Sequence, residues 1–369
     1  MRASFILRRT ARVVAILAAI AGLYIAVVLI HGTIYDWKPE PRIKLEIGGT
    51  ASLGSQKVAI DSSLTFVTWN VGYGGLGSES TFFYDDNRNF FSGDKMVRAP
   101  EALVAKNVRG MCETAHSINA DFVLLQEVDL HSRRSYYTDE MKALAATLSG
   151  YTSTTAVNFN VRRVPLPIAE PWNCIGEVYS GLGTFAKYTP TDAVRLQLPS
   201  QFGWPNRIFH LDRCLAVHRF ATNREGKELV VVNLHNSAYD HTGELKKQEM
   251  SYLKDLLLKE YEHGNYVICG GDWNQCPPNF NPGVLHRPIY PEHSNIPPDL
   301  LPPDWVFAYD PRLPSNRDLA NVYDARKTQT TLIDFFLLSP NVSLLDVHGI
   351  DNEFAFSDHQ PVAMKVQLK

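Results

Sequence analysis

Eight polar side chains stand at or just beyond the ends of short apolar runs in this sequence. Each is a carboxylate, an imidazole or a carboxamide, and these groups bind hard metal ions, move protons and hold phosphate oxygens. Short runs of β-branched and aromatic residues bounded by Gly, Pro or Asn predict buried strands, and polar groups at the same end of several strands converge on one pocket. The pattern therefore predicts an enzyme. The eight residues are Asn70, Glu127, His235, Asp272, Asn274, Asp334, Asp358 and His359.

The first metal-binding candidate is Glu127, which follows the apolar residues 122–125. A carboxylate beside a buried strand is unfavourable unless it binds a cation or a hydrogen-bond donor. Asn70 ends the run 64–69 and precedes a glycine-rich loop, where its amide can form a turn and can also serve a metal site.

Two pairs of residues are candidates for proton transfer. Asp272 and Asn274 lie two residues apart, so they point to the same side of an extended segment. Asp358 and His359 directly precede the apolar residues 361–366. An imidazole in such a position needs a partner that fixes its tautomer and favours its charged form.

In their order along the chain, these motifs resemble those of the endonuclease/exonuclease/phosphatase superfamily of metal-dependent phosphoesterases. Each short motif is weak evidence alone, but six of them in the family order are together distinctive. The resemblance runs from residue 64 to the C-terminus. The matching elements are Trp69-Asn70, Leu125-Gln126-Glu127, Asn233-Leu234-His235, Gly271-Asp272-Trp273-Asn274, Asp334-Phe335-Phe336-Leu337-Leu338 and Ser357-Asp358-His359.

The resemblance implies a divalent metal ion, Mg²⁺ with Mn²⁺ as a substitute, bound as one or two ions. The predicted metal ligands are Asn70, Glu127 and Asp358. In the family, the residue that matches Asn70 supports or ligates the same ion as the glutamate through its amide oxygen.

The resemblance also implies the catalytic roles. Asp272 would orient or deprotonate water, and Asn274 would hold a phosphoryl oxygen. His235 would donate to the phosphate or to the leaving oxygen. Asp334 would orient His359, whose role as a general base or as a charged phosphate clamp stays open.

The intervening segments predict the elements that hold these residues. Residues 100–118 and 244–261 carry apolar side chains at helical spacing, and residues 151–220 are dominated by strand-like, proline-punctuated segments. This order predicts two sheets packed face to face with helices outside. The resemblance implies the same α+β fold, a four-layer α/β/β/α sandwich of mostly antiparallel sheets. The proline-rich residues 277–303 are predicted to border the pocket.

The N-terminus differs in composition from the rest of the chain. Four arginines precede residues 13–30, which carry no charge and are apolar on every face, and about 17–25 such residues span a bilayer as a helix. A cleaved signal peptide is the alternative, but its apolar region is typically about 7–15 residues long. The arginines predict a cytoplasmic N-terminus. The predicted organisation is a basic cytoplasmic segment 1–12, a transmembrane anchor 13–30, a tether 31–63 and an extracytoplasmic catalytic domain 64–369.

Charge and cysteine content constrain function less. The formal charge is −3, and the four N-terminal arginines contribute +4 to it, which leaves −7 for residues 13–369. An acidic domain has no overall electrostatic attraction to nucleic acid. The five cysteines fit no metal-ligand spacing, and Cys174 with Cys214 is the pair expected to form any disulfide. Five arginines that could contact phosphate are interpreted as solvated: Arg133, Arg134, Arg162, Arg163 and Arg213.

The sequence thus predicts a single-pass, membrane-anchored phosphoesterase with no evident protein partner. One fold hosts many substrates, so three classes stay open: phospholipid head groups, as in sphingomyelinases; nucleic acid outside the cytoplasm; and phosphomonoesters of a small molecule or lipid. The position beside a bilayer and the acidic charge slightly favour lipid. The non-enzymatic alternative is a binding protein that has lost catalysis, but Glu127, Asp272 and His359 are all retained.

Overall fold

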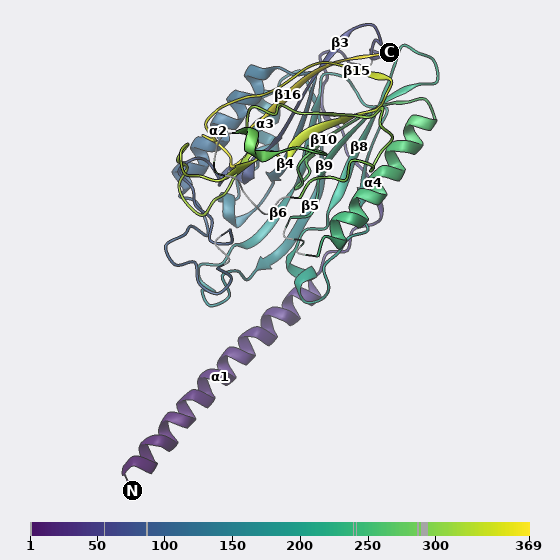
Figure 1. The fold of residues 1–369 in the computed structure, drawn as a ribbon. Coiled ribbons are helices and arrows are strands. Elements are labelled where there is room, and N and C mark those ends of the chain that lie inside the picture. Colours follow the sequence, from purple (N-terminus) through teal and green to yellow (C-terminus); the bar gives the residue numbers. More distant parts are fainter. Residues whose placement is uncertain are drawn as a thin grey trace.

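The first element is a long apolar helix that projects from the rest of the chain (Figure 1). The computed structural model describes residues 2–369 except 55, 86–87, 239, 241, 286–287 and 289–293. Helix α1 (Arg2–Ile34) contains a 29-residue candidate membrane span, Ile6–Ile34, whose most apolar window is not buried against the described chain. By length and composition this helix can cross a membrane, but a signal sequence near an N-terminus has the same properties. The helix extends beyond the predicted 13–30 because arginine and alanine, which precede that run, are good helix formers.

Two seven-stranded sheets form the rest of the fold. Among the described residues, neighbouring strands are antiparallel except for the parallel pairs β3 with β4 and β9 with β10. In order, the first sheet contains β15 (Val342–Gly349), β16 (Val362–Leu368), β3 (Ser63–Asn70), β4 (Phe122–Asp129), β6 (Gly176–Ala186), β5 (Thr152–Val164) and β2 (Gly48–Gly49). The second contains β1 (Arg42–Lys44), β7 (Asp192–Gln197), β8 (Cys214–Ala221), β9 (Glu228–His235), β10 (Tyr266–Asp272), β14 (Asp334–Leu338) and β11 (Val306–Ala308).

The sheets pack face to face, and helices cover their outer faces. Between the sheets, the ring of Phe66 stacks on Phe122 and meets the edge of Phe336 from the second sheet. Helices α2 (Glu101–Ile118) and α3 (Glu140–Thr147) pack on the first sheet, and α4 (Glu244–Glu262) packs on the second. Figure 1 shows α2 and α4 on opposite sides of the strands. The expected four-layer α/β/β/α sandwich is confirmed, and strands covered on both faces explain the continuous apolar runs.

Strand pairing brings the polar strand ends to a common edge. In the parallel pair β9 and β10, Asp272 lies opposite His235. In the parallel pair β3 and β4, Asn70 lies opposite Gln126, one residue before Glu127. Strand β14 begins at Asp334, which lies directly opposite Asp272 in the antiparallel pair β10 and β14. A side-chain hydrogen bond of 2.7 Å from Gln126 to Asn233 joins the edges of the two sheets.

Residues 31–63, expected to form a tether, are packed onto the domain. They contribute β1, which pairs with β7, and β2, which pairs with β5. Leu45 and Val58 in this segment are buried. The segment therefore adds edge strands to both sheets and is not a free linker.

The five cysteines are all free and buried, so the expected Cys174–Cys214 disulfide is wrong. Cys214 lies in β8, where its thiol faces the backbone carbonyl of Val157. Cys174 lies in the connection between β5 and β6, where its thiol faces Pro171 O. The two thiols occupy different apolar sites, and burial suits a reduced cysteine.

Gly271, which directly precedes Asp272, provides a stability prediction. Its φ is 154°, and a Cβ at this position would lie 2.0 Å from the Leu234 backbone oxygen in β9. Because a strained backbone costs about 1–3 kcal/mol, we expect Gly271→Ala to reduce the free energy of unfolding by at least that amount, as measured by urea melts. The matched control is Gly203→Ala, which has no atom within 4 Å of its new Cβ. Equal midpoints for the two variants would contradict the prediction.

Candidate active site

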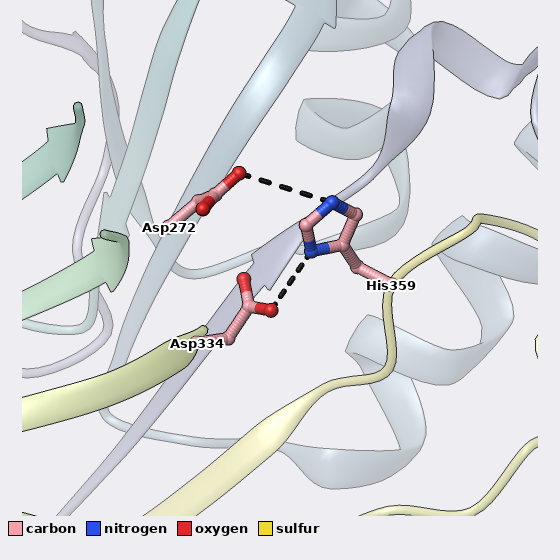
Figure 2. Close-up of side chains that lie close together, drawn as sticks. All are labelled: Asp272, Asp334 and His359. Carbon is pink, nitrogen blue, oxygen red and sulfur yellow. Dashed lines mark hydrogen bonds and ion pairs between the residues drawn. The ribbon is translucent and has the colours of Figure 1, made fainter. Parts of the chain in front are cut away.

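An imidazole and two carboxylates form the centre of the site (Figure 2). His359 Nδ1 lies 2.8 Å from Asp334 Oδ2, and His359 Nε2 lies 3.8 Å from Asp272 Oδ2. One candidate ligand atom from each residue lies within 4.8 Å of the other two. The three side chains come from the segment before β16, the start of β14 and the end of β10. Elements far apart in the sequence thus supply one compact cluster.

Asp334 is held in place by Ser315, which no sequence motif indicates. Ser315 Oγ donates to Asp334 Oδ2 at 2.7 Å and accepts from the backbone N–H groups of Ile333 and Asp334 at 3.0 Å. The other carboxylate oxygen, Oδ1, is buried and has no hydrogen-bond partner among the described residues. A buried carboxylate of this kind is stabilised by an adjacent positive charge, which the imidazolium of His359 supplies.

The carboxylates around His359 favour its charged form. Burial acts to lower the pKa of the imidazole, but Asp334, Asp358 and Asp272 together raise that pKa well above its usual value. Nδ1 donates to Asp334 Oδ2, and Nε2 lies 3.0 Å from Asn316 Nδ2. No sequence pattern indicates Asn316, because its strand β12 (Asn316–Arg317) has only two residues and follows no apolar run.

Asp272 and Asn274 face the site because Trp273 between them is fully buried. The Trp273 ring stacks on Phe335 with ring centroids 4.8 Å apart. The Asn274 backbone N–H donates to Asp272 Oδ1 at 2.9 Å, and Asn274 Nδ2 donates to Asn236 O at 2.9 Å. The buried tryptophan therefore fixes both the turn and the direction of the two polar side chains.

Asn70 connects the carboxylate of Glu127, near the end of β4, with that of Asp272, at the end of β10. Its Nδ2 donates to Glu127 Oε1 at 3.2 Å and to Asp272 Oδ2 at 3.0 Å. Its Oδ1 accepts from the backbone N–H of Gly72 at 3.0 Å, and this bond fixes the orientation of the amide. In this orientation the nitrogen of Asn70 positions both carboxylates, and its oxygen keeps a second lone pair.

Glu127 stands at an irregularity in β4. The register between β4 and β6 shifts between Leu125 and Val128, and Glu127 has a φ of 55°. Its side chain remains 24% exposed, whereas that of Asp272 is 2% exposed. A bulge re-aims a side chain, and here it turns the carboxylate toward the cavity.

His235 lies beside the same carboxylates. Its Nε2 is 3.5 Å from Asp272 Oδ2 and 3.8 Å from Glu127 Oε1. Burial lowers the pKa of His235 well below its usual value, and the positive charges of Arg213 and His359 lower it further. A neutral imidazole donates from one nitrogen only, and the neighbouring carboxylates favour a proton on Nε2.

The carboxylates of the site fit a divalent cation. Glu127, Asp272 and Asp358 all line one cavity, and Mg²⁺ and Mn²⁺ prefer oxygen ligands. Burial raises the pKa of Asp272 and that of Asp358, the latter to about 7, although His359 lowers both. A cation would relieve the repulsion that Glu127 adds at Asp358 and would keep these groups ionised. Among the described residues, the group of side chains close enough together to hold a metal ion is Asp272, Asp334 and His359, and the predicted ligands Glu127 and Asp358 line the same cavity as Asp272 and His359.

The cavity has a volume of about 690 Å³. Six of the eight predicted site residues line it. The other two, Asn70 and Asp334, form hydrogen bonds with the lining residues Glu127 and His359, respectively. The structure therefore brings all eight together.

Four cationic side chains also line the cavity: Arg134, Arg213, Lys246 and Arg317. Arg134 donates three hydrogen bonds to the carboxylate of Asp129 and lies 3.7 Å from the centroid of the Tyr73 ring. Lys246, from α4, donates to Asn274 O at 3.1 Å. The sequence suggested that Arg134 and Arg213 are solvated, but both are largely buried in the lining of the cavity. Five carboxylates line the same cavity, so basic groups that can contact an anionic ligand lie beside acidic groups that can contact a cation.

Comparison with known proteins identifies the fold. The sequence profile of the Endonuclease/Exonuclease/phosphatase family matches residues 67–359. Solved structures with a similar fold include an endonuclease/exonuclease/phosphatase from Beutenbergia cavernae DSM 12333, with 16% identity, a TM-score of 0.50, and 83% of this chain and 72% of that chain covered. The human nocturnin catalytic domain with bound sulfate anion has 11% identity, a TM-score of 0.51 and coverages of 88% and 98%. ANGEL2, a 2′,3′-cyclic phosphatase, has 13% identity, a TM-score of 0.50 and the same coverages. No curated protein sequence matches the chain.

Proposed function

The chain belongs to the endonuclease/exonuclease/phosphatase family, and from this membership we propose that it hydrolyses phosphodiester bonds with the help of a divalent metal ion. Members of the family are hydrolytic phosphoesterases and generally depend on divalent metals. The observation that carries the proposal is the buried cluster of Asp334, His359 and Asp272, which meets Glu127 at one cavity lined by both carboxylates and basic side chains.

The residues of the cluster are suited to hydrolysis of an anionic ester. A divalent cation held by Glu127 and Asp358 would neutralise phosphoryl oxygens and lower the pKa of a bound water. Asp272, whose Oδ1 is held by the Asn274 backbone N–H, can orient a water molecule or accept its proton. His359 acts through Nε2, where the charged ring holds a phosphoryl oxygen and the neutral ring accepts a proton; Asp334 holds Nδ1 in either case.

The leaving oxygen requires a donor on the other side of the phosphate. Neutral His235 has the proton that this role needs, and its Nε2 faces the carboxylate edge. Asn274 keeps a second amide hydrogen for a phosphoryl oxygen after donating one to Asn236 O. These roles follow the assignments that the family resemblance implies.

Among substrates, we favour a phospholipid head group, as in sphingomyelinases. The support is the apolar helix α1, which would keep the cavity beside a bilayer, together with the acidic charge of residues 13–369, which opposes binding of nucleic acid. An extracytoplasmic nuclease and a phosphomonoesterase are the alternatives.

Hydrolysis assays on the detergent-solubilised full chain test the proposal. The substrates are bis(p-nitrophenyl) phosphate, sphingomyelin, phosphatidylinositol lipids, plasmid DNA and p-nitrophenyl phosphate, each with Mg²⁺, Mn²⁺ or EDTA. We expect metal-dependent cleavage of the diesters, with the lipid substrates cleaved fastest. The variant His359→Ala, prepared in the same way, is the control, and any activity that it keeps measures contamination by other hydrolases. Cleavage of DNA alone would identify a nuclease, and cleavage of the monoester alone would identify a phosphomonoesterase. Absence of all cleavage would contradict the proposal.

We also propose that α1 is an uncleaved single span with a cytoplasmic N-terminus. An apolar helix of 29 residues is long enough to span the bilayer and to stay there as an anchor if it is not cleaved. We therefore expect the full-length chain to stay with membranes after an alkaline carbonate wash, and protease added from outside to digest the domain. A soluble product that begins at or after Gly22 would identify a signal sequence, and protection from protease would reverse the orientation.

A further inference from the structure

The cavity that holds the catalytic cluster also has an apolar wall. This wall comprises Phe159, Leu166, Ile175, Phe202, Phe209 and Leu211. Four of its members, Phe159, Leu166, Ile175 and Leu211, pack together in one hydrophobic cluster with Val178. The wall joins the end of β5 and the start of β6 to the segment 202–211.

Segment 202–211 also packs against the C-terminal end of α1. A Cβ at Gly32 would lie 2.9 Å from Phe209 Cε1 and 2.9 Å from Ile208 Cδ1, so the helix and the segment are in direct contact. Trp204 Nε1 donates to Thr33 Oγ1 at 3.2 Å, and Arg207 forms an ion pair with Asp36. Phe209 therefore touches α1 and the cavity at once.

The contact places the wall at the surface of the bilayer if α1 spans it. The candidate span ends at Ile34, two residues beyond the glycine that packs on Phe209. Trp204, beside Thr33, is 61% exposed, and tryptophan is enriched where a protein crosses the membrane–water interface. In this position, the end of the wall at Phe209 lies level with the boundary of the hydrocarbon region of the membrane.

An apolar wall in the cavity is suited to an apolar part of a ligand. Apart from Phe159, which is buried, the side chains of the wall are only partly buried. Such surface is stabilised when an apolar group displaces water from it. The sugar–phosphate backbone of a nucleic acid is polar and its bases stack on aromatic rings, whereas the hydrocarbon chains of a lipid can cover the aliphatic and the aromatic side chains of the wall alike. The catalytic cluster and the wall line one cavity, so a single amphiphilic molecule can reach both.

We propose that the substrate is a phospholipid taken from the bilayer that holds α1, with its phosphoester at the catalytic cluster and part of a hydrocarbon chain on the apolar wall. This inference rests on the proposed phosphodiesterase activity and deepens it, because it assigns a binding site to the chain as well as to the head group. It also makes α1 part of the substrate path, since Phe209 connects the helix to the cavity.

A series of soluble diesters tests the wall without a membrane. The probes are methyl, butyl and octyl p-nitrophenyl phosphate, used as monomers with the detergent-solubilised full chain. Each methylene moved from water onto the wall should raise kcat/KM by about fourfold, equivalent to about 0.8 kcal/mol, until the wall is covered. Hydrolysis of all three at equal kcat/KM would overturn the inference and leave the proposed activity standing, whereas hydrolysis of none would contradict the activity itself.

Variants of Phe209 test whether the dependence of kcat/KM on chain length arises from the apolar wall. We expect Phe209→Ala to reduce the ratio of octyl to methyl kcat/KM by at least about tenfold, and Phe209→Leu to restore most of it. The matched control is Phe90→Ala, because Phe90 is 65% exposed and does not line the cavity. Melting curves establish that each variant is folded. An equal ratio for Phe209→Ala and Phe90→Ala would contradict the assignment.

Reconstitution tests delivery from the same bilayer. The full chain is placed in phosphatidylcholine vesicles, and a fluorescent sphingomyelin is supplied either in those vesicles or in a separate vesicle population. We expect at least a tenfold faster rate for lipid in the same vesicles, because the wall begins at α1 and lateral supply raises the effective concentration. Equal rates would show that the substrate does not enter along the anchor.

Discussion

His359→Ala is expected to lower kcat by about a hundred- to ten-thousand-fold, the usual effect of removing a general acid or base. Its Nε2 is the nitrogen that faces Asp272 and the cavity. Asp334→Asn should be milder, because the imidazole remains and loses only the carboxylate that orients it and raises its pKa. Initial rates on bis(p-nitrophenyl) phosphate measure both effects.

The double variant decides whether the two residues act as one unit. A carboxylate that orients an imidazole has little value once the imidazole is gone, so the two losses should not add. We expect the double variant to be little slower than His359→Ala alone. A loss equal to the product of the two single effects would show independent roles and would make Asp334 a structural residue. Because Asp334 is fully buried, melting curves must precede the kinetics.

Glu127→Gln is expected to raise the Mg²⁺ concentration for half-maximal activity by at least about tenfold. Loss of a residue that only orients a ligand costs metal affinity about ten- to a hundredfold, and a direct ligand should cost no less. The amide keeps the size of the side chain but lacks the charge that holds a hard cation. Activity titrated with Mg²⁺ provides the measurement.

A matched substitution controls for the unusual backbone at this position. Glu353 also has a positive φ, 53°, but it is exposed and does not line the cavity. Glu353→Gln should leave the Mg²⁺ titration unchanged. An unchanged titration for Glu127→Gln as well would remove Glu127 from the metal site.

The sequence by itself predicted the two long helices of the domain and the eight polar residues that the structure brings together. The helical spacing at 100–118 and 244–261 predicted α2 and α4 almost to the residue, because periodicity and chain breakers act locally. The polar residues after the apolar runs were sufficient to indicate the site, because parallel and antiparallel neighbours in these sheets bring strand ends to one edge. Asp272 opposite both His235 and Asp334 is the clearest example.

Only the tertiary structure decided which groups support and surround that site. Ser315 and Asn316 follow no apolar run, yet they hold Asp334 and His359 through contacts between segments distant in sequence. The orientation of the Asn70 amide depends on the Gly72 backbone N–H and on two carboxylates from other strands. The contact of Gly32 with Phe209 joins α1 to the cavity across a large part of the chain. Such contacts depend on how completed elements pack, and no local pattern of residue types specifies that packing.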